Sequence, residues 1–351
     1  MTAQSAGHDD RSGSGTSASG VRRGLVLGGG GSLGAAWTIG ALCVLEDAWG
    51  WDPRSADIIL GTSAGAIVGS LVALGARPRD ILSHQRGDTA QSGIRVDYDT
   101  WVGGALPRIP RPGIGSLKML CDAVRHPHRM PFTMLLAACA PPGQGNLNGV
   151  RDLFRQLEMG DRWTHNPALR VVAVDLDRGV RVLFGAPDAP CTDLASAVTA
   201  SCALPAWFAP VEIGGRRFVD GCAWSDTNLD LVAGEGLDEV FVLAPTCVRH
   251  MDHPRSVPAQ VERQLRRIAT WRLLHEAQLV RQAGARVRMI VPGPEDLAAM
   301  GANLMDPQRR LSVLETSLRT TAAALRKPRL ERAASESGPG VRGTRDPGTV
   351  A

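Results

Sequence analysis

The sequence has few aromatic residues and little excess charge, and both features exclude classes of protein. Aromatic residues make up 4% of the chain, with Tyr98 as the single tyrosine, so a stacking platform for single-stranded nucleic acid is not expected. The 39 basic and 35 acidic residues leave a net charge of +4, which is too small to predict a nucleic-acid-binding surface. We therefore expect no nucleic-acid partner.

Paired cysteines and long apolar runs are also absent. None of the seven cysteines forms a C-x-x-C pair, so no zinc ribbon is expected, and an odd count without regular spacing favours reduced thiols. The N-terminal residues lack the apolar segment of a secretory signal, and no uninterrupted apolar run is long enough to predict a membrane span. These absences predict a cytoplasmic protein and leave open contact with a membrane surface from that side.

The sequence does contain enough apolar material for a folded domain. Hydrophobic residues make up 44% of the 351 residues, and a chain of about 300 residues buries roughly 75% of its unfolded surface. Residues 1–20 and 333–351 are polar and rich in small residues and predict disordered tails, which leaves a domain over residues 21–332. Within it, residues 93–145 contain a stretch rich in proline and glycine and predict a cap or long loop.

Two kinds of apolar segment alternate along this domain. Short apolar runs predict buried strands, and longer segments with helical spacing predict helices. Strands are expected at 24–27, 58–60, 171–175, 240–245 and 287–292, helices at 35–49, 64–74 and 261–281, and a hairpin at 211–219. Strands that alternate with helices predict an α/β fold with a largely parallel sheet.

A glycine-rich loop at residues 28–34 follows the first predicted strand and opens the first predicted helix. Glycine lets several backbone N–H groups converge near a helix N-terminus, which suits an anion. The spacing of Gly29, Gly31 and Gly34 fits the pyrophosphate fingerprint of a dinucleotide site, and the same N–H groups suit an oxyanion hole. A tight turn without a ligand is the third interpretation, and the loop alone does not decide between them.

Residues 61–65 form a G-x-S-x-G motif after the second predicted strand. Small residues on both sides of Ser63 allow a sharp turn that presents its hydroxyl at the top of the sheet, although a simple small-residue turn has the same pattern. A serine nucleophile needs a base, and none of the eight histidines lies in a compact motif. Asp220 follows the predicted hairpin, but an Asp-Gly pair alone is often only a turn.

Four segments, in their order along the chain, resemble the motifs of the patatin-like phospholipase family. Residues 25–42 resemble its glycine-rich oxyanion segment, and residues 61–66 resemble its nucleophile elbow. Residues 200–210 resemble its A-S-x-A-x-P-x-x-F segment, and residues 219–221 resemble its D-G-[GA] aspartate motif. Each motif is short, but the ordered set is specific and spans more than half of the chain.

The resemblance implies a three-layer α/β sandwich with a central, mostly parallel sheet. It also implies a lipid acyl hydrolase of the phospholipase A or lysophospholipase type, in which Ser63 is the nucleophile and Asp220 the base of a dyad. The oxyanion donors would be Gly29, Gly30 and Gly31. The resemblance implies no metal and no cofactor, and a lipid ester, at a membrane surface or free, is the expected partner. The remaining motif glycines are Gly28, Gly34, Gly61, Gly65 and Gly221.

The chain departs from the family pattern at two positions. Many members carry Arg or Lys where this chain has Leu33, so any role of that cation is not carried over. Cys222 stands where glycine is commoner, but Asp220 is retained and Asn228 follows at a suitable distance.

Three other interpretations remain open. An α/β-hydrolase with a Ser–His–Asp triad would use His250, His253 or His275 as base. A dehydrogenase would need an acidic residue about 20 positions after the glycines, and the nearby Asp52 lies in a predicted turn. A catalytically silent lipid-binding module is the third interpretation, although silent relatives typically lack the serine or the aspartate, and both are present here.

The predicted helix at 261–281 carries arginines among apolar residues. A basic amphipathic helix with Trp271 on its apolar side predicts contact with an anionic membrane surface. The alternative is that the apolar side packs on the sheet and the arginines face solvent. The arginines are Arg263, Arg266, Arg267, Arg272 and Arg281.

Overall fold

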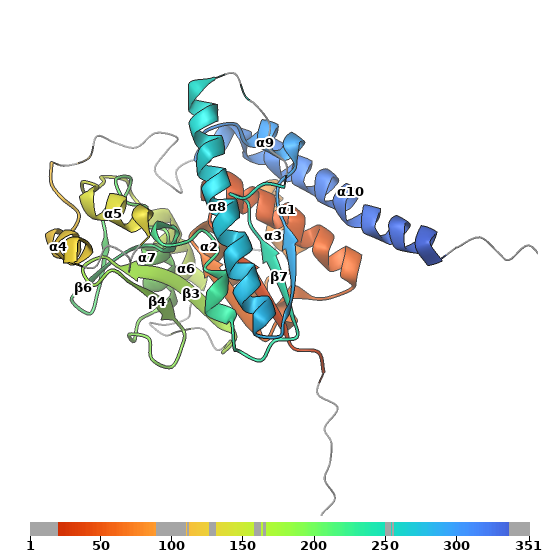
Figure 1. The fold of residues 1–351 in the computed structure, drawn as a ribbon, viewed down its shortest axis with the longest axis horizontal. Helices are drawn as coiled ribbons and strands as arrows, with labels where there is room; N and C mark the ends of the chain where they lie inside the picture. The colour runs from red at the N-terminus through yellow and green to blue at the C-terminus, as the bar shows by residue number, and fades with distance from the viewer. Residues whose placement is uncertain are drawn as a thin grey trace, which may run out of the picture.

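A mixed sheet of eight strands lies at the centre of the described structure (Figure 1). The computed structural model describes residues 20–88, 110, 112–125, 131–157, 163, 166–249, 254 and 256–336. The strands follow the order β5-β6-β3-β2-β1-β7-β8, and β4 pairs with β3 outside this path. The strands are β1 Arg23–Leu27, β2 Ile58–Thr62, β3 Leu169–Asp175, β4 Val180–Phe184, β5 Val211–Ile213, β6 Arg216–Asp220, β7 Glu239–Leu243 and β8 Arg286–Ile290.

Helices flank this sheet on both faces. None of those in the described residues combines the length and apolar character needed to cross a membrane. The α-helices are α1 Gly31–Trp49, α2 Ala64–Ala73, α3 Pro78–Gln85, α4 Leu117–Arg125, α5 Phe132–Cys139, α6 Asn148–Leu157, α7 Leu194–Ser201, α8 Val257–Gln282, α9 Pro294–Met300 and α10 Arg310–Glu336.

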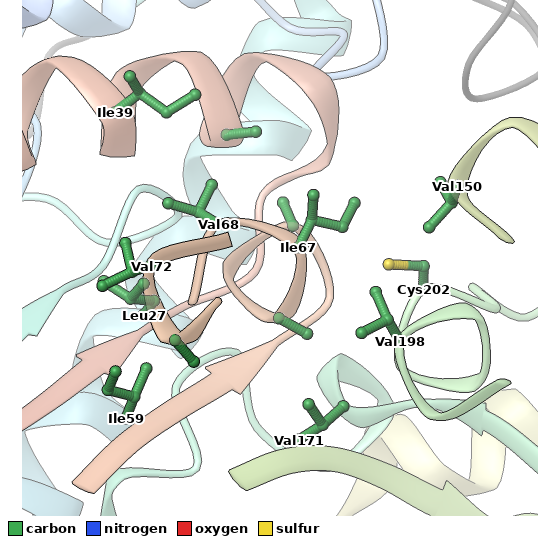
Figure 2. Packing of buried hydrophobic residues seen from close by; sticks show 14 of the residues in the cluster. Leu27, Ile39, Ile59, Ile67, Val68, Val72, Val150, Val171, Val198 and Cys202 are labelled. Atoms are coloured by element: carbon green, nitrogen blue, oxygen red, sulfur yellow. The ribbon is translucent and has the colours of Figure 1, made fainter. Parts of the chain in front are cut away.

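Side chains of the central strands alternate between two buried faces. Leu27 and Ile59 pack with residues of α1, α2 and α7 on one face, which Figure 2 shows from close by. Val26, Ile58 and Leu60 pack on the other face, which α8 covers. Burial on both faces explains the continuous apolar runs of these strands. The three layers confirm the predicted α/β sandwich with a mostly parallel sheet.

Strands β2 and β6 pair with the same edge of β3 and meet end to end. The other edge of β3 is taken by β4, which pairs with residues 171–175. Parallel β2 ends at Thr62, opposite Val172, and antiparallel β6 ends at Asp220, opposite Ala173. These positions are neighbours along β3, so the chain of β2 must leave the sheet after Thr62. The C-terminal ends of β2 and β6 therefore face each other.

Most predicted elements are confirmed, with ends shifted by a few residues. The predicted strands correspond to β1, β2, β3, β7 and β8, the hairpin to β5 and β6, and the helices to α1, α2 and α8. The sequence did not predict β4 or the helices α3, α6, α7, α9 and α10. Helix α10 continues to residue 336, past the predicted start of the C-terminal tail. The described part of the predicted cap contains α4 and α5. Residues 1–19 and 89–109 lie outside the described residues.

Helix α8 packs apolar side chains on the sheet, as one of the two alternatives from the sequence predicts, but it also buries two of its arginines. Arg263 and Arg266 are 5% and 2% exposed, and both pair with Glu262. The single carboxylate of Glu262 compensates part of the charge that these two arginines bury. The predicted outward basic face is therefore wrong for these two arginines, although Arg267 and Arg281 are exposed. The side chains that α8 packs on the sheet are Ala269, Leu273, Ala277 and Val280.

Candidate active site

Ser63 lies at a sharp turn between β2 and α2. Its backbone angles are φ 55° and ψ −123°, a conformation that residues other than glycine rarely adopt and that occurs mainly at functional sites. The turn requires glycine at Gly65, where an added Cβ would lie 2.0 Å from the carbonyl oxygen of Leu27. At Gly61 an added Cβ would lie 2.5 Å from Ala66 Cα. The turn therefore has the strand–elbow–helix form predicted for this motif.

The Ser63 hydroxyl donates a hydrogen bond to Asp220 Oδ2 over 2.7 Å. The two residues are 9% and 2% exposed and lie together because β2 and β6 meet end to end. The Cys222 amide donates to Asp220 Oδ1 over 2.8 Å, so both carboxylate oxygens have a partner. A hydroxyl within hydrogen-bond reach of an oriented base is the arrangement that nucleophilic catalysis requires.

Burial raises the pKa of Asp220 to about 7, against weaker lowering effects of its hydrogen bonds from Cys222 and Ser63. An ordinary aspartate has a pKa near 4 and is a weak base. A group that accepts and returns a proton is most effective when its pKa lies near the operating pH. Burial also raises the pKa of the Cys222 thiol, which keeps that neighbour uncharged at neutral pH.

Ser201, the last residue of α7, holds the elbow from the side. Its Oγ accepts a hydrogen bond from the Ser63 amide over 2.9 Å and donates to the carbonyl oxygen of Val172 over 2.6 Å. These bonds join α7, β3 and the elbow. Ser201 lies in the segment 200–210 that resembles a family motif, and this position was the available signal for its role, which was not predicted.

The glycine-rich loop lies directly against Ser63. A Cβ added at Gly29 would lie 3.1 Å from Ser63 Cβ. The Gly29 amide donates to the carbonyl oxygen of Asp226 over 2.9 Å, so this predicted oxyanion donor is already engaged. Within the described part of the chain, no backbone acceptor binds the amides of Gly30 and Gly31 at the N-terminus of α1. Two of the three predicted donors are therefore available to a ligand.

The other motif glycines also mark close packing around this loop and the aspartate. Gly28, Gly34 and Gly221 each lie where an added Cβ would come within 3.2 Å of another atom. At Gly221 the contacted atom, the carbonyl oxygen of Val172, is only 2.8 Å away. These contacts explain why larger side chains do not fit next to Ser63 and Asp220.

We predict that Gly31→Ala slows the ester hydrolysis expected from the sequence by about a hundred- to a thousand-fold, the usual cost of losing one oxyanion donor. Gly31 has φ +61°, and its Cβ would lie 2.9 Å from the backbone oxygen of Leu304, so the loop must shift. Gly50→Ala is the matched control, because Gly50 ends the same helix at φ +59° with nothing within 4 Å. Turnover of a soluble ester and thermal melting separate activity from stability. Equal turnover in the two folded variants would contradict the prediction.

A cavity of about 430 Å³ opens beside Ser63 and Asp220. Its volume lies within the range of small-molecule sites, which are typically apolar with a few polar groups. The polar wall includes Asp226, Glu262 and Arg266. The apolar lining includes Ile67, Leu147, Leu204, Trp207, Phe208, Leu265 and Met305.

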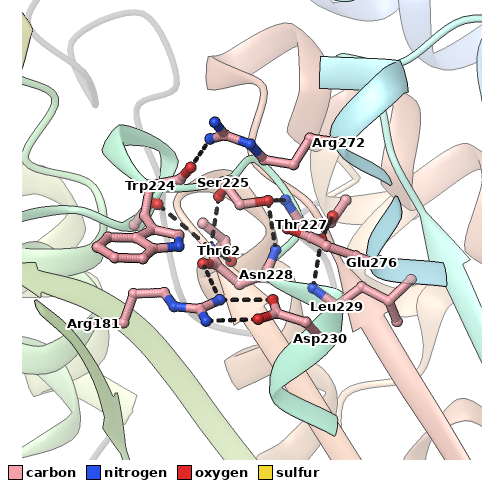
Figure 3. Close-up of polar contacts among 11 residues, drawn as sticks. Thr62, Arg181, Trp224, Ser225, Thr227, Asn228, Leu229, Asp230, Arg272 and Glu276 are labelled. Atoms are coloured by element: carbon pink, nitrogen blue, oxygen red, sulfur yellow. Dashed lines mark hydrogen bonds and ion pairs between the residues drawn. The ribbon is translucent and has the colours of Figure 1, made fainter. Parts of the chain in front are cut away.

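Buried polar contacts fix the loop that follows Asp220 (Figure 3). Asn228 is fully buried, and its side-chain amide donates to the carbonyl oxygen of Ser225 over 2.6 Å and to Thr62 Oγ1 over 3.2 Å. The Glu276 carboxylate of α8 accepts a hydrogen bond from the Leu229 backbone amide over 2.9 Å. The loop is therefore tied to the end of β2 and to α8, which positions the start of the loop at Asp220.

The residues that the other interpretations require and that the structure describes lie away from Ser63 and Asp220. His275 lies on the exposed side of α8 with its ring stacked on Trp271, while His250 and His253 lie outside the described residues. Asp52 pairs with Arg54 and caps a short 3-10 helix. The described residues contain no group of three or more His, Cys, Asp or Glu side chains that could hold a metal ion.

Some solved structures are similar to this chain. VipD from Legionella pneumophila is 15% identical over 85% of this chain and 67% of its own, with a TM-score of 0.37. The type III effector ExoU is 17% identical over 88% and 53%, with a TM-score of 0.36. ExoU in its heterodimeric complex with SpcU from Pseudomonas aeruginosa is 20% identical over 90% and 61%, with a TM-score of 0.29. The chain thus spans about half to two thirds of these proteins.

None of the curated proteins matches the chain. The profile of the family described as patatin-like phospholipase matches residues 25–233. The match covers more than half of the chain and includes the glycine-rich loop, the elbow at Ser63 and Asp220. The chain belongs to the patatin-like phospholipase family.

Proposed function

We propose that this protein hydrolyses carboxylic esters of lipids, in the manner of a phospholipase A or lysophospholipase, with Ser63 as nucleophile and Asp220 as base. The observation that carries the proposal is the 2.7 Å hydrogen bond between Ser63 Oγ and Asp220 Oδ2. The strained elbow, the raised pKa of Asp220 and the adjacent apolar cavity support it. Membership of a lipid hydrolase family supports the substrate class.

In the first half of the reaction, Ser63 Oγ attacks the ester carbonyl carbon while Asp220 accepts the hydroxyl proton. The carbonyl oxygen becomes an oxyanion, which receives hydrogen bonds from the amides of Gly30 and Gly31 and lies near the positive end of the α1 dipole. We leave Gly29 out of the donor set because its amide is engaged by Asp226. The intermediate collapses when the leaving alcohol takes the proton from Asp220.

In the second half, water replaces the alcohol. Asp220 accepts a proton from the water as it attacks the acyl-serine carbonyl, and the same amides hold the second oxyanion. The proton then returns to Ser63 Oγ as the fatty acid leaves, which restores the starting state. Every proton transfer uses one carboxylate, so no histidine or cofactor is needed.

The two rival functions are less well supported. A Ser–His–Asp triad would need a histidine at the cavity, and none of its described lining residues is a histidine. A silent lipid-binding module would not need a serine in a strained conformation bonded to a buried aspartate. We also propose a reducing, cytoplasmic location, which the seven free cysteines support, and a lipid ester as partner.

We predict that activity falls at acidic pH. Asp220 must be ionised to accept the proton, and its pKa is raised to about 7 by burial. The specificity constant kcat/KM for a soluble ester should therefore fall about tenfold per pH unit below that pKa and level off above it. A profile that stays flat well below neutral pH would contradict this role for Asp220.

A further inference from the structure

The outward side of α8 carries a stripe of exposed apolar side chains. They recur at spacings of three or four residues, so they lie along one side of the helix, and their exposed fractions run from 49% to 70%. The stripe extends over residues 257–274, about 26 Å at the rise of an α-helix. We call this set the α8 stripe: Val257, Val261, Leu265, Ile268, Trp271 and Leu274.

The α8 stripe is continuous with the cavity that contains Ser63. Leu265 belongs to the stripe and is 61% exposed, and it also lines the cavity. Glu262 and Ala269, on the inner side of the same helix, line the cavity as well. A surface that contacts the stripe therefore lies next to the entrance of the site. Figure 1 shows α8 as the front layer of the molecule in that view.

The exposed side of α8 also has a charge of one sign. Both acidic residues of the helix are withdrawn from solvent, since the Glu262 side chain is 11% exposed and Glu276 is 4% exposed. Arg267 and Arg281 are exposed. The solvent side of the helix thus combines apolar side chains with cations and carries no carboxylate. This combination is complementary to an anionic lipid surface.

We propose that the α8 stripe docks on the surface of an anionic lipid bilayer, with α8 lying in the interface plane. The apolar side chains would enter the boundary between head groups and acyl chains, with Arg267 and Arg281 beside the anionic head groups. Docking places the cavity entrance against the lipid, so an ester can enter without crossing water. This inference rests on the proposed function for the direction of substrate entry, but the docking itself is measured independently.

The first test measures vesicle binding in a Ser63→Ala background, which prevents lipid hydrolysis. Vesicles of phosphatidylcholine and phosphatidylserine in equal parts are cosedimented with the parent and with the double variant Ile268→Gln, Trp271→Gln. Neither residue lines the cavity. We expect the double variant to bind about tenfold or more weakly, because two apolar side chains no longer leave water. The control is Val180→Gln with Leu311→Gln, two side chains that are each 45% exposed, and it should bind like the parent.

Equal binding by the parent and the stripe variant would overturn the proposal, as would absence of vesicle binding by the parent. Size-exclusion chromatography tests the alternative that the stripe mediates self-association. A parent dimer that the stripe substitutions convert to a monomer, with vesicle binding unchanged, would assign the stripe to self-association.

A second readout separates this inference from the proposed function. In the presence of Ser63, the stripe variant should hydrolyse a soluble short-chain ester at the normal rate and vesicle phospholipid at least tenfold more slowly. If wild type with Ser63 intact hydrolysed neither substrate while the stripe substitutions still abolished vesicle binding in the Ser63→Ala background, the proposed function would fail and docking would stand. If wild type and the stripe variant attacked vesicle lipid equally, docking through α8 would be wrong while the hydrolase function stood.

Discussion

Ser63→Ala is expected to abolish ester hydrolysis, with turnover falling by about a million-fold, as in serine hydrolases that lose the nucleophile. The change removes one hydroxyl from a residue whose backbone is held by Ser201, so the protein should fold normally. The amides of Gly30 and Gly31 and the apolar cavity would remain, but no acyl-enzyme could form. Turnover of a soluble ester by the purified variant, with thermal melting as a folding check, measures the effect.

A matched serine gives the control for this substitution. Ser70 lies in α2, seven residues after Ser63, and is also buried. Within the described part of the chain, its hydroxyl has no hydrogen-bond partner. Ser70→Ala should therefore retain near-normal turnover and stability. Purified Ser63→Ala that kept more than about a tenth of the activity would retain far more than the residual activity expected after loss of a nucleophile. The assignment of Ser63 would then fail.

Asp220→Asn is expected to cost on the order of ten-thousand-fold in turnover, because the amide cannot accept the serine proton. The double variant should be little worse than Ser63→Ala alone, since residues that act as a unit lose function together. Asp296→Asn is the control: Asp296 is 2% exposed, its pKa is also raised by burial, and it does not line the cavity. Near-normal turnover in Asp220→Asn would remove Asp220 from the reaction and favour a histidine base.

The same substitution should stabilise the protein at neutral pH. The pKa of Asp220 is raised to about 7 by burial, above the unfolded value near 3.9, so between these values the folded state binds more protons. Wild-type stability therefore falls as pH rises through this window. Asp220→Asn removes that loss, and its gain in free energy of unfolding should be small at pH 4 and on the order of 2–4 kcal/mol at pH 8. Denaturant unfolding at the two pH values measures it; an equal gain at both would contradict the raised pKa.

Local sequence patterns predicted the parts of this structure that depend on neighbouring residues. The runs that became β1 and β2 are apolar throughout because both faces of the sheet are covered. The elbow at Ser63 was predictable because the turn leaves no room for a side chain at Gly61 and Gly65, and both glycines lie within two residues of Ser63. In each case the physical requirement lies within one turn or one strand.

The parts that depend on distant residues were not predictable from local pattern. Asp220 meets Ser63 across 157 positions, through the shared edge of β3, and only the family resemblance pointed to it. The engagement of the Gly29 amide depends on the carbonyl of Asp226, which no motif specifies. The helical spacing of the sequence predicts that apolar residues and arginines both lie around α8. Which arginines are buried depends on their pairing with Glu262 in the folded structure.

Labelling with a fluorophosphonate tests the central claim most directly. The reagent forms a covalent bond only with an activated serine, so it reports the nucleophile without any assumption about the lipid substrate. After digestion and mass spectrometry, we predict a single adduct on Ser63 that is absent from Ser63→Ala and much slower to form in Asp220→Asn. An adduct on a different serine, or equal labelling of wild type and Ser63→Ala, would contradict the account.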